Sequence, residues 1–176
     1  MQSRCSENIF LTGFMGAGKS TVGRLLAELL QCRFIDLDEM LVAREQRSIT
    51  AIFSVDGESY FRDIETAILQ EIDVRQATVY ATGGGIILRE ENRRTMRLLG
   101  WTIYLQTSWS TIRKRLMSST ERPLVDPEKC WDDVEALWSQ RQPYYEDADL
   151  IVVTDGFTPM QVAQRIVAEL RERMTP

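Results

Sequence analysis

A glycine-rich segment near the start of the chain constrains the fold more than any other feature. Gly13–Ser20 reads GFMGAGKS and fits G-x-x-x-x-G-K-[S/T], a loop whose backbone N–H groups surround the phosphates of a nucleotide. Lys19 can then bridge the β- and γ-phosphates, and Ser20 can bind Mg²⁺. The apolar strand Ile9–Leu11 precedes the loop and the helix-periodic segment Lys19–Gln31 follows it. This context favours a phosphate-binding loop over a plain glycine-rich turn with an exposed lysine.

Strands and helices alternate along the rest of the chain, separated by short connections. This order predicts a three-layer α/β/α fold in which helices cover both faces of a central five-stranded parallel sheet. The 176 residues suit one domain, 1–176, in which we expect a substrate-binding segment at about 37–65 and a mobile lid at about 118–129. Expected strands are 9–11, 34–35, 78–81, 101–105 and 150–153. Expected helices begin near 19, 40, 49, 58, 90, 109, 131 and 159. We expect Ser48 to cap the helix that begins near 49, and the helix that begins near 58 to reach Ile72.

Composition and charge exclude several classes of function. With 21 basic and 26 acidic side chains the net charge is −5, which disfavours nucleic-acid binding because the phosphate backbone requires a basic face. The chain contains no histidine, which removes histidine-based acid–base catalysis and most zinc sites. No apolar run approaches the roughly 18 residues of a membrane span, residues 1–8 lack a signal-peptide core, and the three cysteines form no C-x-x-C pair. We therefore expect a cytoplasmic protein without a nucleic-acid or membrane partner.

Two carboxylates follow the second expected strand, in the sequence Asp36-Leu37-Asp38. Ligand sites of doubly wound sheets lie at the carboxyl ends of the strands, where the glycine-rich loop also lies. Because alternate residues of an extended segment point to one side, Asp36 and Asp38 can share a site while Leu37 turns away. One could hold Mg²⁺ through water, and the other could accept or orient the proton of an attacking hydroxyl. Alone, the pattern also fits a solvated turn with helix-capping aspartates.

Glycines and arginines could complete such a site. Gly83–Gly85 follows the third expected strand and could offer N–H donors to an anion or to hydroxyls, although a flexible turn is the alternative. Arg62 could grip a carboxylate with two parallel hydrogen bonds, and Arg122, on the expected lid, could swing over a transferring phosphoryl group. Arg115 and Arg141 could each stack on a base. Taken singly, each of these arginines is more often a surface residue.

Together these segments resemble the shikimate kinase family, from about Ile9 to Leu170. The resemblance rests on separate motifs in the family's order. They are Gly13–Ser20 with the following Thr21-Val22-Gly23-Arg24, Asp36-Leu37-Asp38, Ser48-Ile49-Thr50-Ala51-Ile52-Phe53, Gly57-Glu58, Phe61-Arg62-Asp63-Ile64-Glu65, Thr82-Gly83-Gly84-Gly85, Arg122-Pro123-Leu124, and Arg141 with Tyr145. The stretch 154–158 carries no arginine, although some members have one there.

The resemblance implies a monomeric kinase of the phosphate-binding-loop type that uses ATP and Mg²⁺. Its substrate would be shikimate, phosphorylated on the 3-hydroxyl to give shikimate 3-phosphate and ADP, in chorismate and aromatic amino-acid biosynthesis. The implied catalytic residues are Lys19, Asp38 and Arg122, with Asp38 as the candidate base. The implied shikimate-binding residues are Asp38, Arg62, Gly83, Gly84, Gly85 and Arg141, the two arginines clamping the carboxylate. The implied nucleotide-binding residues are Gly16, Ala17, Gly18, Lys19, Ser20, Thr21, Arg115, Arg122 and Pro159, and the implied Mg²⁺ ligands are Ser20 and Asp36.

Three other functions compete with this interpretation. Another small-molecule kinase with the same loop, such as a gluconate kinase, would share Asp36 but would not need Arg62 and Arg141 together with the triglycine. A nucleoside monophosphate kinase would need a base-recognition pocket, which the sequence does not indicate. A nucleotide-binding module without catalysis is disfavoured by the intact Lys19 and Asp38.

Overall fold

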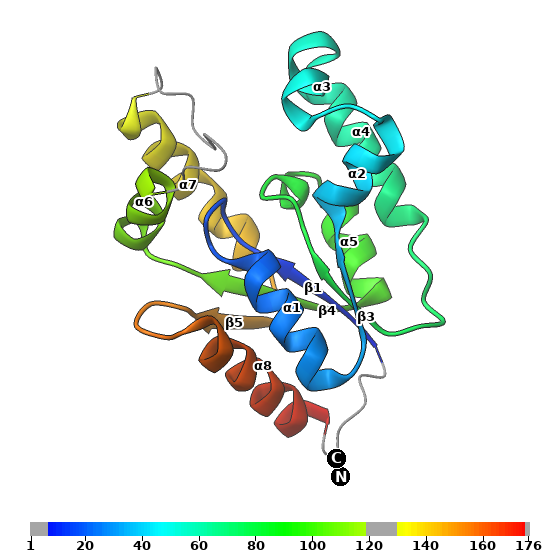
Figure 1. Cartoon of the computed structure of the whole chain (residues 1–176), viewed down its shortest axis with the longest axis vertical. Helices are drawn as coiled ribbons and strands as arrows, with labels where there is room; N and C mark the ends of the chain where they lie inside the picture. The colour runs from blue at the N-terminus through cyan, green and yellow to red at the C-terminus, as the bar shows by residue number, and fades with distance from the viewer. Residues whose placement is uncertain (1–6, 119–129, 175–176) are drawn as a thin grey trace.

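The computed structural model describes residues 7–118 and 130–174, which build around a five-stranded sheet (Figure 1). The strands are β1 (Asn8–Thr12), β2 (Arg33–Asp36), β3 (Thr78–Ala81), β4 (Gly100–Gln106) and β5 (Leu150–Val153). Their order is β2-β3-β1-β4-β5, and every neighbouring pair is parallel. β2 and β3 therefore lie on one side of β1, and β4 and β5 lie on the other, so the strand order reverses beside β1. Ligand sites of doubly wound sheets form at such a reversal.

Helices cover both faces of the sheet, which confirms the predicted three-layer architecture. They are α1 (Lys19–Leu30), α2 (Leu37–Glu45), α3 (Ile49–Val55), α4 (Gly57–Gln70), α5 (Glu90–Leu99), α6 (Trp109–Ser118), α7 (Trp131–Tyr145) and α8 (Pro159–Met174), with a 3-10 turn, η1 (Ile86–Leu88), after β3. In Figure 1, α1 and α8 lie side by side on one face, and α5 packs behind the sheet against β4. Because both faces are covered, β1 and β3 are buried along their whole lengths, whereas the edge strand β5 alternates buried and exposed residues.

Local hydrogen bonds explain where several helices begin and end. The Ser48 hydroxyl accepts a hydrogen bond from the Ala51 N–H at 3.2 Å, so the predicted cap of α3 is confirmed. The expectation that α4 reaches Ile72 is wrong, since the helix ends at Gln70. The next residues form a tight turn in which the Asp73 carboxylate accepts hydrogen bonds from the backbone and side chain of Arg75. Ile72 still packs against the core from this turn.

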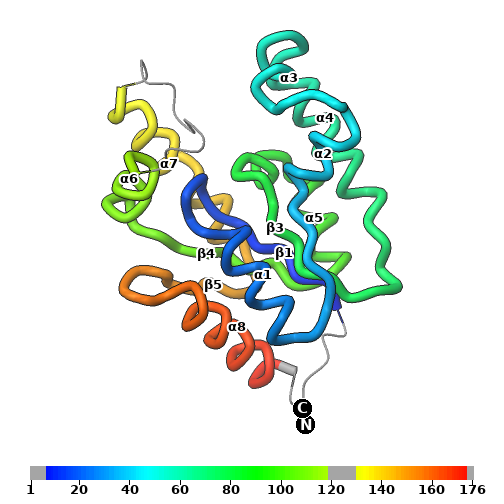
Figure 2. Tube along the Cα trace, in the orientation of Figure 1, coloured from blue at the N-terminus to red at the C-terminus, as the bar shows by residue number. Residues whose placement is uncertain are grey.

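The loops that follow the parallel strands gather at one edge of the sheet. Figure 2 shows α2, α3 and α4 grouped on one side of this edge and α6 and α7 on the other, with the loop after β1 between them. The predicted lid, 118–129, lies outside the described residues except for Ser118, the last residue of α6. In the part of the chain that the structure describes, no helix has the length and apolar character needed to cross a membrane.

Candidate active site

The glycine-rich loop leaves the start of α1 open. Gly16 and Gly18 have φ of 78° and 95°, in the left-handed region that favours glycine. Gly18 directly precedes α1, and no side chain caps the helix. The first N–H groups of α1 and its positive dipole end are therefore directed at the loop, as a phosphate site requires. From α6, Arg115 Nη1 donates hydrogen bonds to Gly16 O at 3.0 Å and Ala17 O at 3.2 Å, which places a positive charge against the same loop.

Lys19 is folded back onto this loop. Its Nζ donates hydrogen bonds to the carbonyl oxygens of Gly13 at 2.8 Å and Phe14 at 3.0 Å. Burial lowers the pKa of Lys19 to about 8, although the charges of Asp38 and Asp36 act in the opposite direction. A phosphate group beside the ammonium would add further negative charge and raise that pKa again, so nucleotide binding would keep Lys19 protonated.

Asp36 and Asp38 reach one cavity, but not for the reason that the sequence suggested. Asp36 ends β2, and its Oδ1 accepts a hydrogen bond from the Asp38 N–H at 3.0 Å, so it caps α2. The expectation that both lie on one side of an extended segment is wrong, because Asp38 is in the first turn of the helix. Leu37 turns into the core, as expected. The Ser20 hydroxyl donates to Asp36 Oδ2 at 2.6 Å, which brings the two predicted Mg²⁺ ligands together.

A cavity of about 610 Å³ joins these groups, within the usual range for small-molecule sites. It runs from the glycine-rich loop to α2, α3 and the loop after β3. Its lining residues are Met15, Gly16, Gly18, Lys19, Ser20, Thr21, Asp36, Asp38, Glu39, Val42, Ala43, Ile49, Thr82 and Gly84. The phosphate-binding loop and the two aspartates thus face one space.

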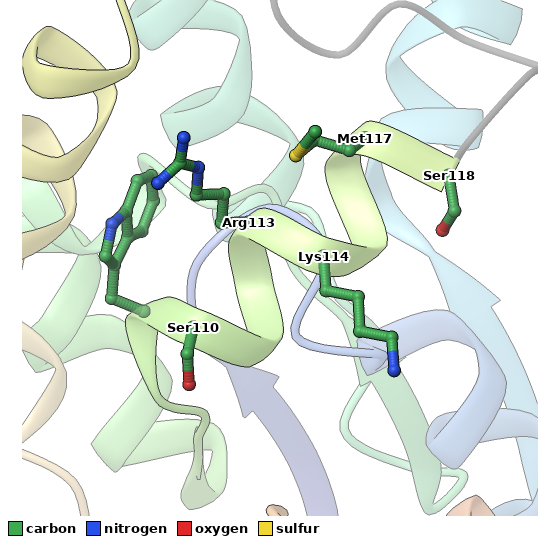
Figure 3. Close-up of a pocket in the computed structure, with 6 residues that line it drawn as sticks. Ser110, Arg113, Lys114, Met117 and Ser118 are labelled. Carbon is green, nitrogen blue, oxygen red and sulfur yellow. The ribbon is translucent and has the colours of Figure 1, made fainter.

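A second hollow of about 520 Å³ lies along α6 and is unsuited to the same chemistry (Figure 3). It is lined by Trp109, Ser110, Arg113, Lys114, Met117 and Ser118, all from one helix. Figure 3 shows Arg113 and Lys114 pointing to different sides of α6, so their charges do not converge on one ligand. None of the predicted site residues is part of its described lining.

The triglycine makes room for charged side chains. A Cβ at Gly83 would lie 2.6 Å from Glu65 Oε1 and 2.8 Å from Asp38 Oδ1, and a Cβ at Gly85 would overlap the Arg62 guanidinium. Glycine is therefore required at both positions for these groups to approach the backbone. The structure brings Asp38 and Arg62 to the triglycine, as predicted.

Arg141 reaches the same loop from α7. Its side chain is 9% exposed, its Nη1 donates to Gly84 O at 3.4 Å, and its guanidinium lies 5.8 Å from the centre of the Phe14 ring. Within the described part of the chain its buried Nε has no hydrogen-bond partner. A buried guanidinium with an unused donor favours an anion beside it, because an unpaired buried charge is costly.

Glu65 belongs to this site although the sequence analysis did not select it. Its Oε2 accepts a hydrogen bond from Arg62 Nη1 at 2.5 Å, and its buried Oε1 has no partner among the described residues. The pKa of Glu65 is raised to about 7, mainly by burial and to a smaller extent by the charge of Asp38, against the lowering effect of Arg62 and Arg141. The signal that could have revealed it is the spacing from Arg62, since residues three apart share a helix face.

Glu65 makes the stability of the protein depend on pH. Its pKa is about 7 in the folded protein, against an ordinary value of 4.5. The proton on Glu65 therefore stabilises the folded state fully below pH 4.5, and this stabilisation is lost as the pH rises to 7. The loss is about 3 kcal/mol, since each pH unit contributes about 1.4 kcal/mol. We expect the free energy of unfolding, measured in urea, to fall over this range in the wild type and less in Glu65→Gln. With no histidine in the chain, few other groups titrate near neutral pH. If the free energy of unfolding fell equally steeply with pH in the wild type and in Glu65→Gln, the pH dependence would not come from Glu65.

Pro159 and Arg122 are the other predicted nucleotide-binding residues. Pro159 begins α8, as predicted, but does not line the cavity. The loop before it is tied to the start of α6 by the Asp155 carboxylate, which accepts hydrogen bonds from the Ser108 N–H and hydroxyl and from the Thr111 hydroxyl. Arg122 lies outside the described residues.

Comparison with known proteins identifies the family. Residues 15–171 match the family model described as shikimate kinase. A shikimate kinase of Thermodesulfovibrio yellowstonii is 41% identical over 163 residues, which cover 93% of this chain and 94% of that protein. The chain belongs to the shikimate kinase family.

Solved structures agree with this assignment. The shikimate kinase of Acinetobacter baumannii, solved in complex with shikimate, superposes with a TM-score of 0.89 at 36% identity, over 97% of this chain and 96% of that one. A gluconokinase of Sinorhizobium meliloti superposes with a TM-score of only 0.56 at 18% identity, covering 97% of each chain. The second likeness shows a shared fold alone, so the rival gluconate kinase interpretation gains no support beyond the fold.

Proposed function

We infer that the protein transfers the γ-phosphoryl group of ATP to the 3-hydroxyl of shikimate, giving shikimate 3-phosphate and ADP in chorismate and aromatic amino-acid biosynthesis. The observation that carries this conclusion is the meeting of Arg62 and Arg141 at the triglycine, next to a cavity that also contains the phosphate-binding loop. Two guanidinium groups beside a phosphate site suit an acceptor that has a carboxylate of its own. Family membership supports the same reaction.

The acceptor would be held by groups from three elements. Arg62 of α4 and Arg141 of α7 would bind the carboxylate of shikimate, while Asp38 and the triglycine would hold its ring hydroxyls. The Arg62 guanidinium already pairs with two carboxylates, the buried Glu65 and the exposed Glu58. Burial favours the protonated form of Glu65, which would leave more of the Arg62 charge available for the substrate.

The phosphoryl transfer would depend on charged groups that the folded protein already holds in position. Lys19 would exchange its two carbonyl partners for the β- and γ-phosphates, while the open start of α1 supplies N–H donors. Asp38, across the cavity, would orient the 3-hydroxyl and accept its proton. Arg122 would add its charge from the predicted lid. In phosphoryl transfer this positioning and neutralisation supply most of the rate acceleration.

Ser20 and Asp36 would hold Mg²⁺. The hydroxyl and carboxylate lie 2.6 Å apart at the phosphate end of the cavity, and such hard oxygen donors suit an ion that keeps several waters and binds phosphate oxygens. When bound, the ion would neutralise charge on the phosphates.

The reaction is tested by a coupled assay of ADP release with Mg·ATP on shikimate, on gluconate and without acceptor. Release that depends on shikimate alone is the expected result. Release with gluconate but not shikimate would retain the phosphate-binding loop and overturn the roles given to Arg62, Arg141 and the triglycine.

Arg141→Lys is expected to raise the KM for shikimate about tenfold or more while changing kcat less, because lysine retains the charge but not the two-pronged donor geometry. The matched control is Arg24→Lys, since Arg24 also lies over an aromatic ring, that of Phe34, yet is exposed and pairs with Glu39 instead of contacting the triglycine. Steady-state kinetics with shikimate as the varied substrate measure both variants. An unchanged KM in Arg141→Lys would remove Arg141 from the site.

We further propose that the enzyme acts as a cytoplasmic monomer. All the residues proposed for the site come from one chain, so catalysis needs no second subunit. Cys130 is a free thiol, which suits a reducing compartment. Sedimentation at the assay concentration tests the monomer.

A further inference from the structure

We propose that Tyr145 is a positioning residue for shikimate binding, because its hydroxyl fixes the orientation of the Gly84–Gly85 peptide. The inference rests on the proposed function and adds a residue that does not itself touch the substrate. It concerns the junction between the last turn of α7 and the triglycine.

The Gly84 carbonyl is held by two donors from α7. Tyr145 Oη donates to Gly84 O at 2.5 Å, and Arg141 Nη1, one helical turn earlier, donates to the same oxygen at 3.4 Å. Tyr145 is only 1% exposed, and burial raises its pKa well above the ordinary value, so the phenol stays protonated and able to donate at neutral pH. A carbonyl oxygen can only accept, so the direction of this hydrogen bond is fixed.

The peptide between two glycines needs such a restraint. Without side chains on either residue, its plane can rotate at low cost. In a planar trans peptide the C=O and the next N–H point in opposite directions. Holding Gly84 O toward α7 therefore turns the Gly85 N–H away from α7, and the Arg62 guanidinium lies directly against Gly85. The Tyr145 hydroxyl thus keeps one backbone donor beside the carboxylate clamp, available to an oxygen of bound shikimate.

The neighbouring Tyr104 provides a matched control. Its ring stacks on that of Tyr145 with centres 5.1 Å apart and planes 14° apart, and it is equally buried. Its hydroxyl, however, donates to Gln142 Oε1 at 2.6 Å and not to the triglycine. Removing either hydroxyl takes a part-buried hydrogen bond from the same stacked pair, but only the Tyr145 hydroxyl contacts Arg141 and restrains Gly84.

The experiment compares Tyr145→Phe with Tyr104→Phe in the ADP-release assay. Tyr145→Phe is expected to raise the KM for shikimate about two- to tenfold, the effect of one lost hydrogen bond, with the KM for ATP unchanged. Tyr104→Phe should leave both KM values unchanged, while both variants lose similar thermal stability. An unchanged KM for shikimate in Tyr145→Phe, or an equal rise in Tyr104→Phe, would reduce Tyr145 to a packing residue.

A measurement on the wild type tests the same inference without a variant. The Gly85 amide should become protected from hydrogen exchange when shikimate binds, since its N–H then has an acceptor. An unchanged exchange rate would contradict the inference. Absence of any shikimate-dependent ADP release from the wild type is a different failure, because it would overturn the proposed function and this inference with it.

Discussion

Replacing Lys19 by alanine is expected to lower kcat at least ~10²-fold, because the substitution removes the charge aimed at the transferring phosphoryl group. The ammonium lies in the loop that would surround the phosphates, bound to the Gly13 and Phe14 carbonyls. Burial already lowers its pKa to about 8, so the protein holds this charge at some cost in stability. A charge kept in place at a cost to the folded state is expected at a functional position.

The stability of Lys19→Ala should therefore differ little from that of the wild type, since the lost hydrogen bonds are offset by the removal of a partly desolvated charge. Lys114→Ala is the matched control. Lys114 is exposed on α6 and outside the cavity lining, so its removal should leave kcat unchanged. Steady-state kinetics at saturating ATP and shikimate measure turnover, and thermal unfolding confirms that each variant folds. Near-normal turnover in Lys19→Ala would overturn the assignment of the phosphate-binding loop.

The features predicted correctly from the sequence are those encoded by local patterns. The order of strands and helices follows from apolar periodicity, and α7 begins and ends at Trp131 and Tyr145, as expected. The Ser48 cap and the glycine-rich loop depend on neighbouring residues, so they too could be recognised. Parallel pairing followed from the alternation of element types, although the strand order is visible only in the structure.

What could not be predicted depends on burial and on contacts between distant segments. Asp38 was expected in an extended segment, but the Asp36 side chain caps α2, so Asp38 lies in the first turn of that helix. Glu65 looks like an ordinary helix surface residue until the triglycine packs against it and excludes water. The Tyr145 hydroxyl finds its acceptor 61 residues away along the chain. Such partners are set by tertiary packing, on which the local sequence carries no information.

Asp38→Asn is expected to lower kcat by ~10²- to 10⁴-fold, the usual range for losing a general base. Asparagine retains the size of the side chain and one oxygen acceptor, so it can still orient a hydroxyl but cannot take its proton. The matched control is Asp73→Asn in the exposed turn after α4, which should leave kcat unchanged. A loss below tenfold in Asp38→Asn would show that the aspartate only orients the hydroxyl, as a loose transition state would allow.

The same substitution has a second expected effect, which separates a lost charge from a misplaced side chain. The Asp38 charge raises the pKa of Glu65 and also that of Lys19, so removing it should lower both. The pH range over which Glu65 reduces the free energy of unfolding should then end at a lower pH in Asp38→Asn, with a smaller total loss, while its start near pH 4.5 is unchanged; urea denaturation across that range measures both effects. If kcat falls while this range stays where it is in the wild type, the Asp38 charge does not act on Glu65, and the close approach of the two carboxylates at Gly83 would have to be revised.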